Sequence, residues 1–86
     1  MVRSVRIVGA GLIGTSIGLA LAAKNIAVEM IDVDSRNQAL AQDLTGGVSI
    51  AEPELIILAT PLRALSQVIN EQYELNPNST FMDVCS

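Results

Sequence analysis

Residues 9–14 have the sequence GAGLIG, in which three glycines stand in the pattern GxGxxG. The strand-like run VRIV at residues 5–8 precedes the glycines, and a helix-like apolar run follows them. A second strand-like run, AVEMI at residues 27–31, ends at Asp32. Because the whole arrangement fits in about 30 residues, the sequence predicts a strand–helix–strand unit whose first turn is built from glycine.

Each glycine in this pattern has a physical role if the turn binds a dinucleotide. Gly9 allows the tight turn out of the first strand, and Gly11 lets the backbone approach a pyrophosphate closely. Gly14 lets the helix pack closely on the sheet. The first helical turn, which contains Leu12 and Ile13, then directs N–H groups and a partial positive charge at the phosphates. The alternative is a glycine-rich turn without a ligand.

Asp32 and Arg36 point to different dinucleotides. A carboxylate at the end of the second strand accepts hydrogen bonds from ribose hydroxyls and repels a 2′-phosphate, so Asp32 favours NAD over NADP. Arg36, four residues later, is either a partner for a 2′-phosphate or a solvated surface charge. We therefore expect NAD as the cofactor and leave NADP open. Asp34 is expected to be a turn residue.

The composition indicates a single small domain, residues 1–86. Half of the residues are hydrophobic and only 2% are aromatic, so the core must be aliphatic, which suits a parallel sheet covered by helices. The net charge of −4 argues against nucleic acid and anionic membranes as partners. With no histidine and one cysteine, neither a metal site nor an intrachain disulfide is expected, which suits a cytoplasmic protein.

The uncharged run at residues 7–23 offers an alternative interpretation of the N-terminus. It follows Arg3 and Arg6, much as the apolar part of a secretory signal peptide follows its basic residues. Four glycines make this run a poor apolar segment, and a signal peptide would not explain Asp32 at its expected distance. We therefore expect neither secretion nor a membrane span.

The rest of the chain continues the alternation of strands and helices. Ser35 and Gln38 have the spacing of a capping box, so the second helix is expected to start at Ser35. Thr60 and Pro61 fit the N-cap and first position of a later helix. The order predicts an α/β fold, a Rossmann-type doubly wound parallel sheet of strand order 3-2-1-4-5, truncated after strand five, with a ligand crevice between strands one and four. The expected strands are residues 5–9, 27–32, 48–50, 55–59 and 80–84, and the expected helices are residues 12–24, 35–44 and 61–73.

Three stretches resemble the prephenate and arogenate dehydrogenases. Residues 8–21 are similar to the opening of those enzymes, LATPL at residues 58–62 to their fourth strand and its loop, and DVCS at residues 83–86 to the exit of their fifth strand. Members of this family oxidatively decarboxylate prephenate or arogenate on the way to tyrosine, with NAD or NADP as the cofactor. The similarity implies the same fold and the same type of reaction.

The resemblance also implies roles for individual residues. The three glycines of the turn and Asp32 would hold the cofactor. Thr60 and Pro61 would line the nicotinamide side of the crevice, unless they serve only as a helix cap. Ser86 matches a serine that lies near the substrate and positions the catalytic histidine, and it is the one candidate here for a catalytic-site residue. The alternative for Ser86 is a polar residue without a role.

Two departures from the family pattern limit what the resemblance implies. Residues 46–54 form a shorter segment than the family usually carries there, and the sequence contains no histidine. We therefore expect that the chain lacks the catalytic and dimerisation domain, binds a dinucleotide but no substrate, and is inactive alone. The exposed edge of its last strand is expected to favour a homo-oligomer. The open alternatives are a stand-alone dinucleotide-sensing module and a different β-hydroxyacid-type reductase.

Overall fold

Strands and helices alternate along the chain, as the sequence predicts. The computed structural model describes residues 2–9, 11–32, 34–59 and 70–84. Most element ends lie within one or two residues of the expected ones. The elements are β1 (Ser4–Val8), α1 (Leu12–Ala22), β2 (Ala27–Ile31), α2 (Ser35–Thr45), β3 (Leu55–Leu58) and β4 (Thr80–Asp83), and residues 70–75 are also helical.

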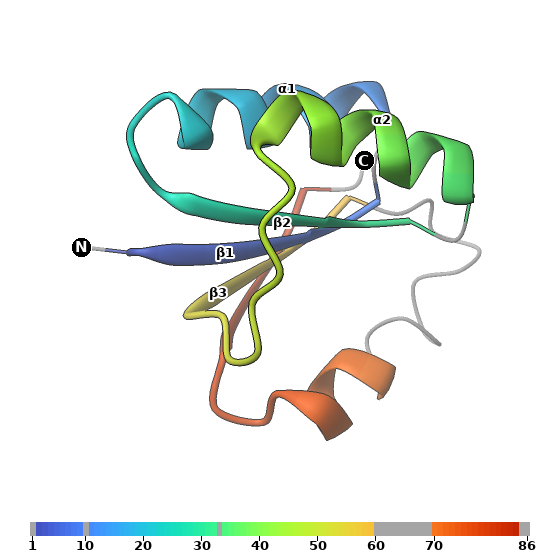
Figure 1. Ribbon diagram of the computed structural model, residues 1–86. Helices are drawn as coiled ribbons and strands as arrows, with labels where there is room; N and C mark the ends of the chain where they lie inside the picture. Colours follow the sequence, from blue (N-terminus) through green and yellow to red (C-terminus); the bar gives the residue numbers. More distant parts are fainter. Residues whose placement is uncertain (1, 10, 33, 60–69, 85–86) are drawn as a thin grey trace.

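The strands of the described residues form one parallel sheet in the order β2-β1-β3-β4. In the central strand β1, Ile7 pairs with Met30 of β2 and with Ile57 of β3. Helices α1 and α2 lie on one face of this sheet, and helical residues 70–75 lie on the other (Figure 1). An α/β fold with a parallel, Rossmann-like sheet is therefore confirmed. The strand order reverses beside β1, and folds of this kind bind ligands at that point.

Residues 48–50 do not form the expected third strand, so the predicted order 3-2-1-4-5 is wrong at its first position. Gly46 and Gly47 have φ angles of 103° and 65°, and the chain then crosses from α2 past the sheet to β3 (Figure 1). The carbonyl oxygen of Ile50 accepts a hydrogen bond of 2.6 Å from Arg6 Nη2. This segment thus gives its backbone oxygen to a side chain instead of to a neighbouring strand.

The two faces of the sheet carry separate apolar clusters, because successive residues of a strand point to opposite faces. The cluster under α1 and α2 has Ile7 and Met30 at its centre, both fully buried. A Cβ atom at Gly18 of α1 would lie only 2.9 Å from Met30 Sδ, so the absence of a side chain there lets α1 approach the sheet. The second cluster contains Val8, Ile56 and Leu58, with Phe81 packed against it.

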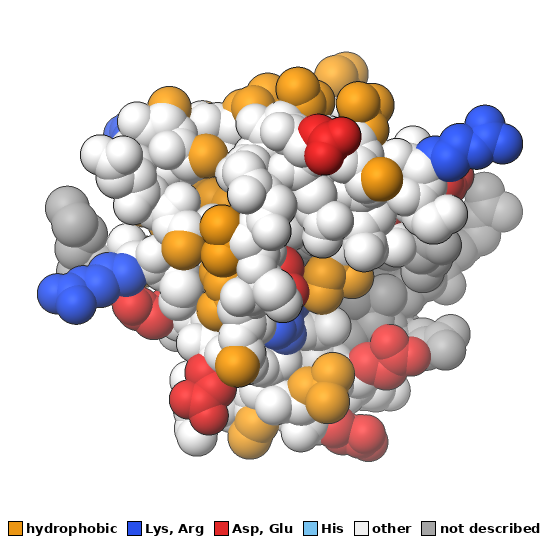
Figure 2. Space-filling model, viewed as in Figure 1, with side chains coloured by type: hydrophobic (Ala, Val, Ile, Leu, Met, Phe, Trp, Pro, Cys, Tyr) orange, Lys and Arg blue, Asp and Glu red, His pale blue; other side chains and the backbone are white. Residues whose placement is uncertain are grey.

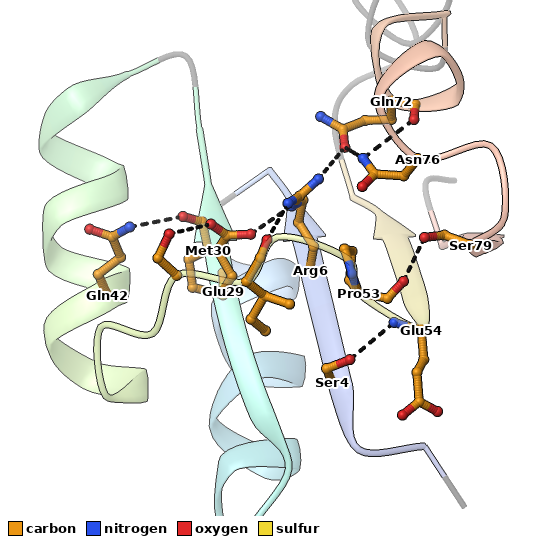
Figure 3. Close-up of polar contacts among 12 residues, drawn as sticks. Ser4, Arg6, Glu29, Met30, Gln42, Pro53, Glu54, Gln72, Asn76 and Ser79 are labelled. Carbon is orange, nitrogen blue, oxygen red and sulfur yellow. Dashed lines mark hydrogen bonds and ion pairs between the residues drawn. The ribbon is translucent and has the colours of Figure 1, made fainter.

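A buried guanidinium joins the elements of the second face (Figure 3). Arg6 is only 8% exposed, and its Nε forms an ion pair of 2.6 Å with Glu29 Oε1 of β2. Its Nη1 donates to Gln72 Oε1 at 3.0 Å, and its Nη2 donates to the carbonyl oxygen of Ile50. Since a buried charge needs both a counter-charge and hydrogen bonds, these three acceptors make Arg6 tolerable inside the fold.

The start of α2 differs in detail from the predicted capping box. The N-cap is Asp34, and its Oδ1 accepts from the backbone N–H groups of Arg36 at 2.9 Å and Asn37 at 3.4 Å. Ser35 is already the first helical residue, and Gln38 turns its side chain toward Asp32. The helix therefore starts at Ser35, as predicted, but its cap is Asp34 and not Ser35.

The outer surface of α1 and α2 keeps several apolar side chains in contact with solvent. Figure 2 shows apolar side chains along the top of the molecule, over these two helices. Those of Leu40 and Leu44 lie one turn apart on α2, and Leu19 lies on α1. In the residues that the structure describes, no helix has the length and apolar character to cross a membrane.

Candidate functional site

A cleft of about 550 Å³ opens at the carboxyl ends of β1 and β3, where the strand order reverses. Its volume falls in the range of small-molecule sites. The start of α1 forms one wall. The other walls are formed by the residue that follows β2, by the first turn of α2 and by the residue that follows β3. The lining residues are Gly11, Leu12, Ile13, Gly14, Asp32, Asn37 and Ala59.

Gly9 makes the turn from β1 into the cleft. Its φ angle is 109°, in a region that residues with a side chain rarely adopt, and its N–H donates to the carbonyl oxygen of Ile31 at 2.7 Å. The first glycine of the GxGxxG pattern is therefore required by the backbone itself, as the sequence predicts.

Gly14 and Gly11 differ in what surrounds them. A Cβ atom at Gly14 would lie 1.9 Å from the carbonyl oxygen of Gly9, so the fold cannot accept one without moving its backbone. A Cβ atom at Gly11 would meet nothing within 4 Å, and the φ angle of −73° there suits any residue. The fold therefore explains Gly9 and Gly14 but not Gly11, whose missing side chain leaves room for something in the cleft.

The N-terminus of α1 faces this room with its backbone donors. Gly11 is the N-cap of α1, and among the described residues no side chain makes a capping hydrogen bond to this end of the helix. The first turn also contains no acidic residue. Between described residues, the first hydrogen bond of the helix runs from the N–H of Thr15 to the carbonyl oxygen of Gly11 at 2.9 Å. The N–H groups of Leu12, Ile13 and Gly14 precede that bond, so they and the positive end of the helix dipole suit an anion.

The side chain of Leu12 is 86% exposed and that of Ile13 is more than half exposed, although both are large and apolar. They belong to the walls of the cleft and not to the core. An apolar pair at the mouth of a cleft is typical of small-molecule sites, which are mostly apolar with a few polar groups that orient the ligand.

Asp32 supplies a carboxylate to the opposite wall. The residue is half-buried, its Oδ1 accepts from the N–H of Asp34 at 2.7 Å, and its own N–H donates to Gln38 Oε1 at 2.8 Å. The structure thus brings together the turn glycines and Asp32, as the GxGxxG spacing predicts.

Arg36 is not part of the cleft wall. Its side chain is exposed, and the contact that the structure gives it is the donation from its N–H to Asp34 Oδ1. Asn37, which sequence reasoning missed, lines the cleft instead, as does Ala59. The position of Asn37 in the first turn of α2 was the available signal, since that turn starts beside the end of β2.

Three of the predicted site residues, Thr60, Pro61 and Ser86, lie outside the described residues. Within the described ranges, no group of three or more histidine, cysteine, aspartate or glutamate side chains could hold a metal ion. A second hollow, of about 250 Å³, lies at the amino ends of β3 and β4. Glu52 and Glu54 line it, and their charges do not suit a phosphate.

Comparison with known proteins agrees with this geometry. Residues 4–56 match the family described as the NAD-binding domain of 3-hydroxyacyl-CoA dehydrogenase, and no match was found among curated proteins. The matched region runs from β1 to the second residue of β3 and includes the glycine turn and Asp32. It identifies a dehydrogenase-type domain with NAD as its cofactor, and it does not support prephenate or arogenate dehydrogenase in particular. Since the match spans more than half of the chain, the chain belongs to the family of 3-hydroxyacyl-CoA dehydrogenase NAD-binding domains.

Proposed function

We propose that the cleft holds NAD for a dehydrogenase reaction, in which bound NAD supplies the hydride acceptor. The observation that carries this proposal is Gly11, whose absent side chain serves no packing need and opens directly into the cleft. A dinucleotide accounts for it, because a pyrophosphate needs close approach to the backbone at that position.

Each wall of the cleft then has a separate task. The N–H groups of the first turn of α1, from Leu12 to Gly14, bind the pyrophosphate. Asp32 accepts hydrogen bonds from the adenosine ribose, and its charge disfavours a 2′-phosphate. Thr60 and Pro61 are proposed for the nicotinamide side, because in the sequence they come after Ala59, which follows β3 and lines the cleft.

Titration calorimetry of the purified chain with NAD⁺ and then NADP⁺ tests this proposal. We expect NAD⁺ to bind more tightly, and Gly11→Val to weaken binding by about tenfold or more, since its side chain would occupy the space for the pyrophosphate. Ala39→Val is a matched control, because Ala39 is exposed on α2 and does not line the cleft. A folded chain that binds neither dinucleotide would refute the proposal.

For the substrate, we propose prephenate or arogenate. The support is the resemblance of residues 58–62 and 83–86 to that family, since these segments begin at the last residues of β3 and β4 and lie entirely beyond residue 56, where the family match ends. The second candidate is a 3-hydroxyacyl-CoA, which the family match over residues 4–56 favours. Both reactions oxidise a carbon bearing a hydroxyl group, so the NAD site does not distinguish them. Ser86 is proposed to lie near the substrate.

The reading frame after Ser86 tests the substrate proposal. A continuation with a histidine-containing segment and an amphipathic helical region would support a dehydrogenase, because the 86 residues contain no histidine. The protein encoded by the longer reading frame would then be tested for NAD⁺ reduction with prephenate, arogenate or a 3-hydroxyacyl-CoA, and the compound that supports the reaction would be the substrate. A stop codon, with NAD⁺ binding retained, would support a stand-alone dinucleotide-sensing module instead.

A further inference from the structure

A series of hydrogen bonds holds Asp32 at the rim of the cleft, and the side chain of Gln38 makes the last bond of the series. Asp32 Oδ1 accepts from the N–H of Asp34, whose own carboxylate accepts from the N–H groups of Arg36 and Asn37. Gln38, half-buried in the first turn of α2, reaches back so that its Oε1 accepts from the N–H of Asp32 at 2.8 Å. Both ends of Asp32, backbone and carboxylate, are thereby fixed by residues of the turn that follows it.

The hydrogen bond of the Gln38 side chain is not a capping bond. A capping-box side chain stands three residues after the N-cap and accepts from its N–H, whereas Gln38 stands four residues after the N-cap Asp34. It bonds instead to the backbone of the residue whose carboxylate faces the cleft. Because the donor is a backbone N–H, the atom that meets it must be the amide oxygen of Gln38.

We propose that Gln38 is a positioning residue for the choice between NAD and NADP, an inference that rests on the cofactor site proposed above. Gln38 holds Asp32 where its carboxylate meets the ribose hydroxyls of NAD and opposes the 2′-phosphate of NADP. Both effects depend on distance, since a charge–charge interaction weakens as the separation grows. An Asp32 free to turn away from the cleft would lose hydrogen bonds to NAD and repel NADP less.

The test measures the affinities of the full chain for NAD⁺ and NADP⁺ by calorimetry. Gln38→Leu keeps the size of the side chain but removes the acceptor, and we expect about fivefold weaker NAD⁺ binding, the effect of one hydrogen bond. NADP⁺ binding should stay constant or improve, so the ratio of the two affinities should fall by at least that factor. Gln38→Glu retains an acceptor oxygen and should bind NAD⁺ more tightly than Gln38→Leu, with a ratio at or above the wild-type ratio because its added negative charge also opposes the 2′-phosphate.

Gln42→Leu is the matched control. Gln42 lies one turn further along α2 and donates from Nε2 to the carbonyl oxygen of Met30 at 3.3 Å, so it ties the same helix to the same strand away from the cleft (Figure 3). This variant should leave the ratio of affinities unchanged. Thermal melting of every variant separates a loss of fold from a change in selectivity.

Two different failures can be distinguished. If the wild-type chain binds NAD⁺ and Gln38→Leu keeps the wild-type ratio, Gln38 has no positioning role and the cofactor site stands. An equal change of the ratio in Gln42→Leu would also overturn the role of Gln38, since the effect would then come from the attachment of α2. If the wild-type chain binds neither dinucleotide, the proposed function fails and this inference fails with it.

Discussion

Gly14 and Gly11 lie three residues apart at the start of α1, yet a methyl group would meet opposite surroundings at the two positions. At Gly14 it would lie 1.9 Å from a backbone oxygen, and at Gly11 it would meet nothing within 4 Å. Helix propensity favours alanine at Gly14 by about 1 kcal/mol, but overpacking against an immobile carbonyl outweighs that gain.

We therefore expect Gly14→Ala to lower the free energy of unfolding by about 3 kcal/mol. Gly11→Ala should cost about 0.5 kcal/mol, the difference between glycine and alanine at an N-cap, while weakening NAD⁺ binding. Urea denaturation followed by circular dichroism measures both. Equal stability of the two variants would contradict the account of the turn given above.

The roles of the turn glycines and Asp32 could be predicted because they follow from local geometry. A tight turn and a close helix–strand approach need glycine whatever the rest of the chain does. Asn37 and Ala59 could not be predicted in the same way. They come to the cleft because β3 lies beside β1 and α2 starts beside the end of β2, so their role follows from how the elements pack, and for Asn37 the only signal in the sequence was its place in the first turn of α2.

At the scale of elements, the cap of α2 and the segment before β3 show where local patterns compete. Asp34 and Ser35 are both good N-cap residues, and the pattern favoured Ser35 because Gln38 stands three residues later. In the structure the side chain of Gln38 accepts from the N–H of Asp32 instead, and Asp34 caps the helix. Residues 48–50 have strand-like chemistry, but Arg6, distant in sequence, takes the carbonyl oxygen of Ile50.

The ion pair of Arg6 and Glu29 is expected to hold the second face of the sheet together. Both side chains are about nine-tenths buried, so removing one partner leaves an uncompensated charge. We expect Arg6→Met or Glu29→Gln alone to lower stability by about 3 kcal/mol. A double-mutant cycle in guanidinium chloride should give a coupling energy above about 1 kcal/mol. Simple additivity of the two changes would show that the pair contributes nothing as a pair.

At the scale of the whole molecule, the sheet has an exposed edge. In the described chain β4 pairs with β3 on one side, and its Met82 is 49% exposed. Within the described sheet β4 is an edge strand, and an edge strand with an exposed apolar side chain favours pairing with another copy.

We accordingly expect concentration-dependent dimers in sedimentation equilibrium. Met82→Lys should shift the chain toward the monomer, because charged side chains block edge pairing. Leu40→Lys, on the exposed apolar surface of α2, is the comparison. A monomer produced by Leu40→Lys alone would place the contact on the helices instead of on β4. A wild-type chain that stays monomeric at high concentration would contradict the expectation itself.

The buried charge of Arg6 also restricts how the chain can misfold. If β1 slid by one residue against its neighbours, the guanidinium would move to the other face of the sheet, among Val28, Met30 and the helices, where it would lose Glu29 as a partner. A strand made only of valine and isoleucine would tolerate such a slip far better, since either face accepts those side chains. One arginine in an aliphatic strand is therefore expected to make the mispaired sheets unstable and to disfavour the slipped pairings from which aggregates grow.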